Sequence, residues 1–251
     1  MEFQRNWIGL YKPKSIQIDQ KTKSETYGKF KCEPLEKGYG LTIGNSLRRI
    51  LLSSIQGPAI TKVKIDGVQH EFSTITGIKE DVTEIILNLK KLNLKMDTYE
   101  PQTIRLSYSG EGEVTAKDIE TNQHVEIVNE HQFIATLSES ASIDIEMTVE
   151  MGRGYMPTES RDENNHSIGE ILLDAIFSPV TKVNYNITAA RVGRRTDYER
   201  LTLEVWTNGT VSPEDAVAFA AKILKDQMSV FVNFDEEEVD AIPIIEEESD
   251  E

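Results

Sequence analysis

The sequence predicts an α+β fold in which mainly antiparallel sheets are combined with four helices. Several short stretches alternate apolar and polar residues with a period of two, which is typical of strands with one buried face. They are Ser15–Asp19, Lys62–Asp66, Thr103–Ser107 and Ile143–Val149. Asp66-Gly67 and Asn208-Gly209 each follow an apolar run, where a tight turn with positive φ is expected. Four other stretches carry apolar residues at helical spacing.

The first helix is expected from Gly44 to Ile55. Apolar residues recur there at helical spacing, and Gly57-Pro58 ends the pattern. We interpret the preceding Gly38–Gly44 as a tight turn whose small residues let the helix pack closely. Its glycine spacing matches neither a dinucleotide-binding loop nor a P-loop, so a phosphate site at this helix start is the weaker alternative.

Two further helices are predicted in the middle of the chain. The second runs from Val82 to about Leu94, with Asp81 as its N-cap and an apolar stripe along one face. The third runs from Ile168 to Phe177 and ends before Ser178-Pro179.

The fourth helix has strong start signals. Ser212 is the expected N-cap, Pro213 takes the first helical position, and the helix is expected to run to about Val232. The apolar face of this helix is wider than the area that one small sheet would bury. Burial in the chain's own core and contact with a second chain both explain such a face.

Charge is unevenly distributed along the chain. The formal net charge is −16, and every charged residue from Asp235 to Glu251 is acidic. Because like charges repel one another, residues 235–251 are expected to form a disordered acidic tail or linker. The net negative charge argues against direct binding of DNA phosphates by this chain, since proteins that bind them need clustered Lys and Arg.

The cysteine and histidine content predicts no catalytic residue, metal site or cofactor. A single cysteine, Cys32, excludes an internal disulfide and a cysteine zinc cluster, which fits a reducing compartment. The four histidines are scattered, and none lies four residues from another on a predicted helix. No stretch approaches the ~18 consecutive apolar residues that span a bilayer, so no membrane partner is expected and the protein is expected to be cytoplasmic.

Two arginine clusters are candidate binding surfaces. Arg48-Arg49 interrupts the apolar pattern of the first helix, so at least one of the two is a candidate to meet a carboxylate on a protein partner. Ordinary solvent exposure is the alternative. Arg191, Arg194 and Arg195 form the second cluster, and its candidate partners are RNA and a carboxylate on another protein. The net negative charge of the chain favours the protein carboxylate over RNA.

One stretch is specific enough to indicate a family. Residues 33–54, EPLEKGYGLTIGNSLRRILLSS, resemble the hallmark stretch of bacterial and plastid RNA polymerase alpha subunits. The resemblance extends to IDGV at 65–68, HEFS at 70–73, GRGY at 152–155, SPV at 178–180 and TNGT at 207–210. These motifs follow the family's order between about Lys14 and Phe234.

The resemblance implies the two-domain amino-terminal fold of the alpha subunit. Residues 1–56 and 178–234 would form a discontinuous dimerisation domain, and residues 57–177 an inserted, mostly-β domain that faces the large subunits. Gly57-Pro58 and Ser178-Pro179 lie at the two crossings between these domains. The implied function is a non-catalytic subunit of DNA-directed RNA polymerase, a nucleotidyltransferase, that forms homodimers and nucleates assembly of the beta and beta-prime subunits for transcription.

The resemblance also implies roles for individual residues. Arg49 and Leu52, with Arg48, would contact the beta subunit. Glu84 and Lys90, with Leu173, would contribute to the beta-prime side. The first and last helices would pack against those of a second copy, with dimer contacts from Leu47, Leu51, Val217, Ala221, Leu224, Met228 and Phe231.

Full-length bacterial alpha subunits continue into a small helical DNA-binding domain, which has no counterpart after Phe234. The resemblance therefore implies no direct DNA binding by this chain, which would reach the nucleoid only within the polymerase. Two other functions are alternatives to a polymerase subunit. One is an enzyme that binds a nucleotide or phosphate through the glycine stretch at 38–44. The other is a dimeric regulator that binds RNA through Arg191, Arg194 and Arg195 and is inhibited by its acidic tail.

Overall fold

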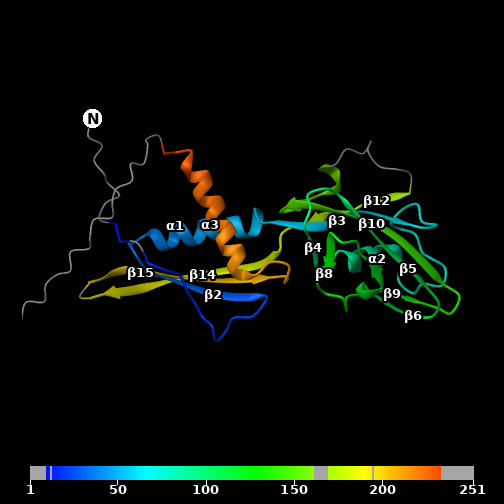
Figure 1. Ribbon diagram of the computed structural model, residues 1–251, viewed down its shortest axis with the longest axis horizontal. Coiled ribbons are helices and arrows are strands. Elements are labelled where there is room, and N and C mark those ends of the chain that lie inside the picture. Colours follow the sequence, from blue (N-terminus) through cyan, green and yellow to red (C-terminus); the bar gives the residue numbers. More distant parts are fainter. Residues whose placement is uncertain (1–9, 12, 161–168, 194, 233–251) are drawn as a thin grey trace, which may run out of the picture.

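The computed structural model describes residues 10–11, 13–160, 169–193 and 195–232. The expected tail, residues 235–251, lies outside these ranges. The described residues form two units, each with its own hydrophobic core, arranged side by side along the longest axis of the molecule (Figure 1). All strand pairings are antiparallel, and the sheets are combined with helices, which confirms the predicted α+β class.

The first unit is a four-stranded sheet packed against two helices. The strand order is β1 (Gln17–Ile18), β2 (Tyr27–Leu35), β15 (Arg195–Thr207) and β14 (Val180–Val192). Helices α1 (Tyr39–Ser53) and α3 (Pro213–Ser229) cross each other on one side of this sheet (Figure 1). Alternate residues of β15, Leu201, Leu203 and Val205, are buried, as expected for a strand with one covered face.

Helix α1 begins earlier than predicted. It starts at Tyr39 instead of Gly44 and ends at Ser53 instead of Ile55. The interpretation of Gly38–Gly44 as a tight turn was therefore wrong except at its first residue. Gly38 has a φ of 91°, which glycine adopts without strain, and it forms the N-cap of the helix.

Gly40 and Gly44 lie within α1 because the helix approaches the sheet closely. A Cβ atom on Gly44 would lie 2.9 Å from side-chain atoms of both Tyr185 and Leu201. Glycine costs a helix about 1 kcal/mol relative to alanine. The local sequence therefore favours a turn, and close packing of the helix on β14 and β15 outweighs that preference.

Helix α3 confirms the predicted start and ends slightly earlier. The Ser212 hydroxyl accepts a hydrogen bond from the backbone N–H of Asp215 at 3.1 Å, and Pro213 is the first helical residue. The helix ends at Ser229 instead of Val232.

The second unit is built around a five-stranded sheet. Its order is β12 (Glu170–Leu172), β3 (Gln56–Ile65), β10 (Ser142–Arg153), β5 (Gln102–Ser109) and β7 (Ile119–Glu120). Three short pairs accompany it: β4 (Leu94–Met96) with β8 (Val125–Ile127), β6 (Gly112–Thr115) with β9 (Phe133–Leu137), and β11 (Tyr155–Met156) with β13 (Ala175–Ile176). Short 3₁₀ turns cover Ala116–Asp118 and Thr158–Ser160. Helix α2 (Val82–Leu89) packs its apolar stripe into the core.

The predicted tight turns have the expected backbone. Gly67 has a φ of 75° and Gly209 a φ of 89°, so both adopt the left-handed conformation that the Asp-Gly and Asn-Gly pairs predicted.

Helix α2 is shorter than predicted. It ends at Leu89 because Leu94, its expected last residue, starts strand β4 and pairs with Ile127 of β8. Its start is confirmed, since the Asp81 carboxylate accepts a hydrogen bond from the backbone N–H of Glu84 at 2.7 Å.

We expect Asp81→Ala to lower the free energy of unfolding by about 1 kcal/mol, because the substitution leaves a backbone donor at the helix start without its acceptor. Urea denaturation measures this difference. Asp81→Asn is the matched control, since asparagine is an equally good N-cap and is expected to retain most of the stability. Equal unfolding midpoints for Asp81→Ala and the unsubstituted chain would contradict the assignment.

The predicted helix from Ile168 to Phe177 was wrong. The segment forms strands β12 and β13 instead, and Ile168 itself lies outside the described residues. Strand β12 pairs with Lys62–Lys64 at one edge of the sheet, so β3 gains backbone hydrogen bonds that a helix could not provide. The buried residues alternate strictly: Ile171, Leu173, Ala175 and Phe177. The sequence does not show this period of two, because Leu172 and Ile176, which lie between the buried positions, are also apolar.

The two units are closely packed where the chain crosses between them. Gly57 of β3 pairs with Gly152 of β10 beside the crossing at Phe177. A Cβ atom on Gly57 would lie 2.2 Å from the carbonyl oxygen of Phe177, and one on Gly152 would lie 2.6 Å from its ring. The side-chain amide of Asn93 also donates to the carbonyl of Asn208 at 3.1 Å, which links the two units.

Candidate functional site

The exposed face of α1 carries two arginines, Arg48 and Arg49. Within the described ranges, neither the Arg48 nor the Arg49 side chain forms a salt bridge or hydrogen bond. Arg105 and Arg200, by contrast, each bind a carboxylate. Leu52 lies close to Arg49 on the same helix and is also exposed. An unpaired guanidinium beside an exposed leucine suits a protein partner that offers a carboxylate and an apolar side chain.

The opposite face of α1 is buried within the chain. Leu47 and Leu51, predicted as dimer contacts, belong to the core of the first unit, and so does Val217 of α3. These residues support the exposed faces of the two helices from inside. They offer almost no surface to a second copy.

The apolar stripe of α3 runs from this core into solvent. Val217, Ala221, Leu224, Met228 and Phe231 follow one another at spacings of three or four residues, so they share one side of the helix and its last turn. Val217 is buried and Leu224 half-buried, whereas Met228 is 54% and Phe231 80% exposed. Figure 1 shows the cause: α3 crosses α1, and its C-terminal half extends past α1 away from the sheet.

The structure brings Lys90 and Leu173 to one corner of the second unit. The Lys90 ammonium lies 3.8 Å from the carboxylate of Asp174, the residue after Leu173. Leu173 is buried in the core, so it can affect a partner only through the corner that it supports. Glu84 is exposed on α2, the same helix that ends just before Lys90.

Asp174 is held in a defined position at this corner. Its Oδ1 accepts a hydrogen bond from the backbone N–H of Thr158 at 3.0 Å. This bond, together with the Lys90 ammonium, keeps the pKa of Asp174 below its usual value. Sequence reasoning missed Asp174 because it assigned this segment to a helix.

The start of α1 already holds an anion from the chain itself. The backbone N–H of Gly40 donates to the Glu199 carboxylate at 3.0 Å. A carboxylate at a helix N-terminus interacts favourably with the free amides and the helix dipole. A phosphate group would have to displace Glu199, which weakens the phosphate alternative for the glycine stretch.

The second arginine cluster is engaged within the chain. The Arg191 side chain donates to the carbonyl of Gly193 at 2.7 Å. Arg195 pairs with Asp197 at 2.7 Å and lies over the ring of Tyr198. Arg194 lies outside the described residues. The described arginines of this cluster are therefore less available to RNA phosphates than Arg48 and Arg49.

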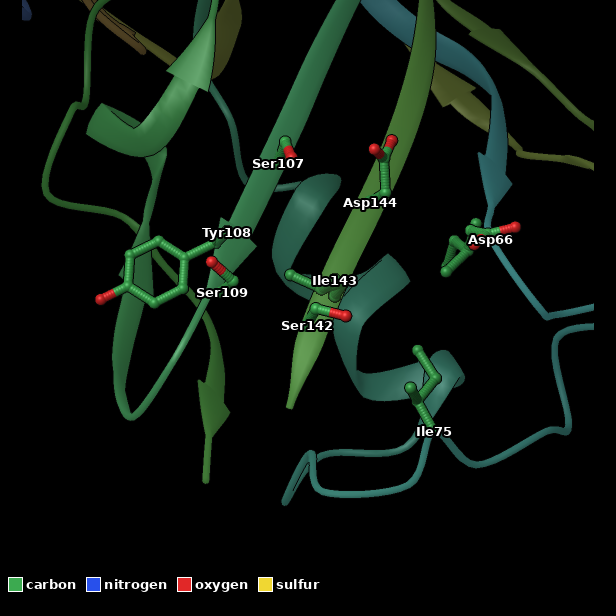
Figure 2. A pocket seen from close by; sticks show the side chains of 9 residues that line it. Asp66, Ile75, Ser107, Tyr108, Ser109, Ser142, Ile143 and Asp144 are labelled. Atoms are coloured by element: carbon green, nitrogen blue, oxygen red, sulfur yellow. The ribbon is translucent and has the colours of Figure 1, made fainter. Parts of the chain in front are cut away.

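A polar cavity of about 270 Å³ lies on the second unit, beside β5, β10 and the end of β3. Figure 2 shows Asp66, Asp144 and three serine hydroxyls around it. Arg105 forms two hydrogen bonds to Asp144, which lowers the pKa of this carboxyl. A carboxylate held ionised in this way is a poor general acid, and no histidine, cysteine or lysine lines the cavity as a second catalytic group.

The described part of the chain offers neither a metal-binding cluster nor a membrane-spanning helix. Its His, Cys, Asp and Glu side chains form no group of three or more that could hold a metal ion. None of the helices there has the length and apolar character needed to cross a membrane.

Comparisons with known proteins point to one family. Residues 63–178 match the family described as RNA polymerase Rpb3/RpoA insert domain. The DNA-directed RNA polymerase subunit alpha of Geobacter metallireducens is 55% identical over 247 residues, which cover 98% of this chain and 72% of the relative. The subunits of Lawsonia intracellularis and Nitratidesulfovibrio vulgaris are 57% and 56% identical over 232 residues, or 92% of this chain and 67% of each relative.

The matched region contains both hydrophobic cores, the unpaired arginines of α1 and the apolar stripe of α3. Identity above 50% over nearly the whole chain agrees with the motifs between residues 33 and 210. The chain belongs to the family of bacterial DNA-directed RNA polymerase alpha subunits.

Proposed function

We propose that this chain forms a homodimer that serves as the assembly platform for the beta and beta-prime subunits of RNA polymerase and performs no chemistry itself. The observation that carries the proposal is the α3 stripe, which leaves its own core near Leu224 and reaches water at Met228 and Phe231. Contiguous apolar surface on a soluble protein usually marks a contact site. A second copy can cover this stripe, because in a twofold dimer the same patch meets itself.

In this proposal the two units have separate tasks. The first unit, from residues 1–56 and 178–234, is the dimerisation domain because it carries α1 and α3. The second, residues 57–177, is an inserted domain that extends toward the large subunits. We further propose that the dimer works within a cytoplasmic polymerase at the nucleoid and does not bind DNA directly.

The exposed face of α1 is the proposed site for the beta subunit. Arg49 and Leu52 provide a charged and an apolar contact, and Arg48 extends the positive charge. Because neither guanidinium has a partner among the described residues, no salt bridge within them is lost when Arg49 binds a carboxylate of beta.

The corner near Lys90 is the proposed contribution to the beta-prime side. Glu84 and Lys90 offer charges of both signs, and Leu173 supports the corner from the core. Because a symmetric dimer meets two different subunits, one copy is proposed to bind mainly beta and the other mainly beta-prime.

The direct test combines sedimentation with co-purification. The full chain is expected to sediment as a dimer at micromolar concentration and to be retained by tagged beta subunit from the same polymerase. A chain that sediments as a folded monomer and is not retained by beta would overturn the proposal.

Arg49→Ala is expected to weaken binding of the beta subunit at least about tenfold, because it removes a charge-assisted contact at the centre of the proposed site. Titration of labelled dimer with beta measures the effect, and sedimentation checks that the dimer persists. Arg191→Ala, which removes an exposed arginine elsewhere on the first unit, is the matched control. Equal affinities for Arg49→Ala and Arg191→Ala would refute the assignment of Arg49.

A further inference from the structure

The corner formed by β11 and β13 carries an apolar patch that the described chain leaves uncovered. Tyr155 and Met156 of β11 are exposed, the former by 59%, and Ile176 of β13 is 66% exposed. The strand pair is only two residues long, and Tyr155 pairs directly with Ile176. Isolated two-stranded pairs are marginal in water, so exposing large apolar side chains on one calls for a partner.

The residues between the exposed side chains hold this corner in place. Ala175 and Phe177, which flank Ile176, are both buried. The backbone N–H of Phe177 donates to the carbonyl of Gly154 at 2.8 Å, and the Asp174 carboxylate accepts from the N–H of Thr158. Tyr155 and Ile176 are therefore presented on a fixed backbone. A fixed apolar surface loses little conformational entropy when it binds.

The patch continues onto the exposed face of α1. Gly154, which precedes Tyr155, lies against the last turn of that helix: a Cβ atom on Gly154 would lie 3.2 Å from the carbonyl oxygen of Ser53. Ser53 in turn donates its hydroxyl to the carbonyl of Arg49 at 2.8 Å. Leu52 and Ser53 follow Arg49 by three and four residues, so each of them is a neighbour of Arg49 on the surface of α1. The apolar corner and the unpaired arginine thus lie on one surface that spans both units of the chain.

We infer that this combined surface is a single docking site for the beta subunit, with Tyr155 and Ile176 as apolar anchors and Arg49 as the charged contact. The inference rests on the proposed function. It adds that the inserted unit takes part in binding beta, together with α1. The matching segment of beta carries apolar side chains that cover the corner and a carboxylate that reaches Arg49, since apolar anchors and arginine dominate the energetics of protein interfaces.

The test is the affinity of purified beta subunit for the full dimeric chain with Tyr155→Ser or Ile176→Asp. Each substitution is expected to weaken binding at least about tenfold, because it removes an anchor or places a charge against an apolar segment. Tyr99→Ser is the matched control, since Tyr99 is 78% exposed in the loop between β4 and β5. Ile176→Val is expected to bind nearly normally. Thermal melting and sedimentation show whether each variant keeps its fold and its dimer.

The outcomes separate this inference from the function on which it rests. Unchanged beta affinity in folded Tyr155→Ser and Ile176→Asp dimers, with binding still sensitive to Arg49→Ala, would overturn the inference and leave the proposed function standing. Normal beta binding with loss of beta-prime would also overturn it, because the corner would then belong to the other subunit. Failure of the unsubstituted dimer to bind beta would instead overturn the proposed function.

Discussion

Gly57→Ala is expected to lower the free energy of unfolding by about 3 kcal/mol, at the upper end of the range for overpacking a well-packed site. The added methyl group would lie 2.2 Å from the carbonyl oxygen of Phe177. That atom belongs to the backbone and cannot move away by changing a rotamer. The strands that cross between the two units must therefore separate, and the packing of the Phe177 ring on Gly152 is disturbed with them.

Gly112→Ala is the matched control for this prediction. Gly112 lies in strand β6, and the nearest atom to an added Cβ is the hydroxyl of Tyr108 at 2.6 Å, the end of a side chain that can rotate. Alanine in a strand is also favoured over glycine by roughly 0.5–1 kcal/mol. Chemical denaturation of both variants is expected to show a large loss for Gly57→Ala and little change for Gly112→Ala. Similar midpoints for the two would show that the junction is less closely packed than described.

Met228→Glu is expected to weaken dimerisation about a hundredfold, which corresponds to about 2.7 kcal/mol. Met228 is 54% exposed on α3, so the substitution removes little of the chain's own packing. In the proposed dimer the new carboxylate would be buried in an apolar contact, and the twofold axis would place a second one in the same interface. Burying an unpaired charge costs several kcal/mol.

Sedimentation over a series of concentrations measures this effect as a shift from dimer to monomer. Ala218→Glu is the control, because it introduces the same carboxylate on the same helix. Each residue turns an α-helix by about 100°, so Ala218 points away from the stripe that begins at Val217. It is exposed and is expected to leave the dimer intact. A dimer that tolerates Met228→Glu as well as Ala218→Glu would show that the stripe is not the interface.

The helices show where sequence reasoning succeeded. The starts of α2 and α3 were predicted because Asp81 and Ser212 accept hydrogen bonds from backbone groups three residues away, a local interaction that the sequence alone specifies. Their ends were predicted less well, because a helix end depends on what the chain meets next. For α2 that is strand β4, which pairs with a segment about thirty residues further on.

One of the two candidate interaction surfaces could be predicted from the sequence and the other could not. The arginine pair of α1 was noticed in the sequence because charge interrupts an apolar pattern, and the structure adds that both side chains lack partners in the described chain. The corner with Tyr155 and Ile176 was missed. Residues 171–177 are apolar at every position except Asp174, so their hydrophobic pattern does not distinguish a strand from a helix. The alternating burial that marks them as strands exists only in the folded structure.

Local sequence features were sufficient to predict the family, the α+β class, the starts of α2 and α3, and the arginine pair that interrupts the apolar pattern of α1. These properties depend on motifs and on neighbours within a few positions, which a linear chain already contains. Long-range packing, by contrast, places Gly40 and Gly44 in a helix, forms strands at Glu170–Leu172 and Ala175–Ile176, and buries Leu51 while Met228 stays exposed. The reason is that burial and strand pairing depend on contacts between residues far apart in the chain, and those contacts exist only after the two units have packed.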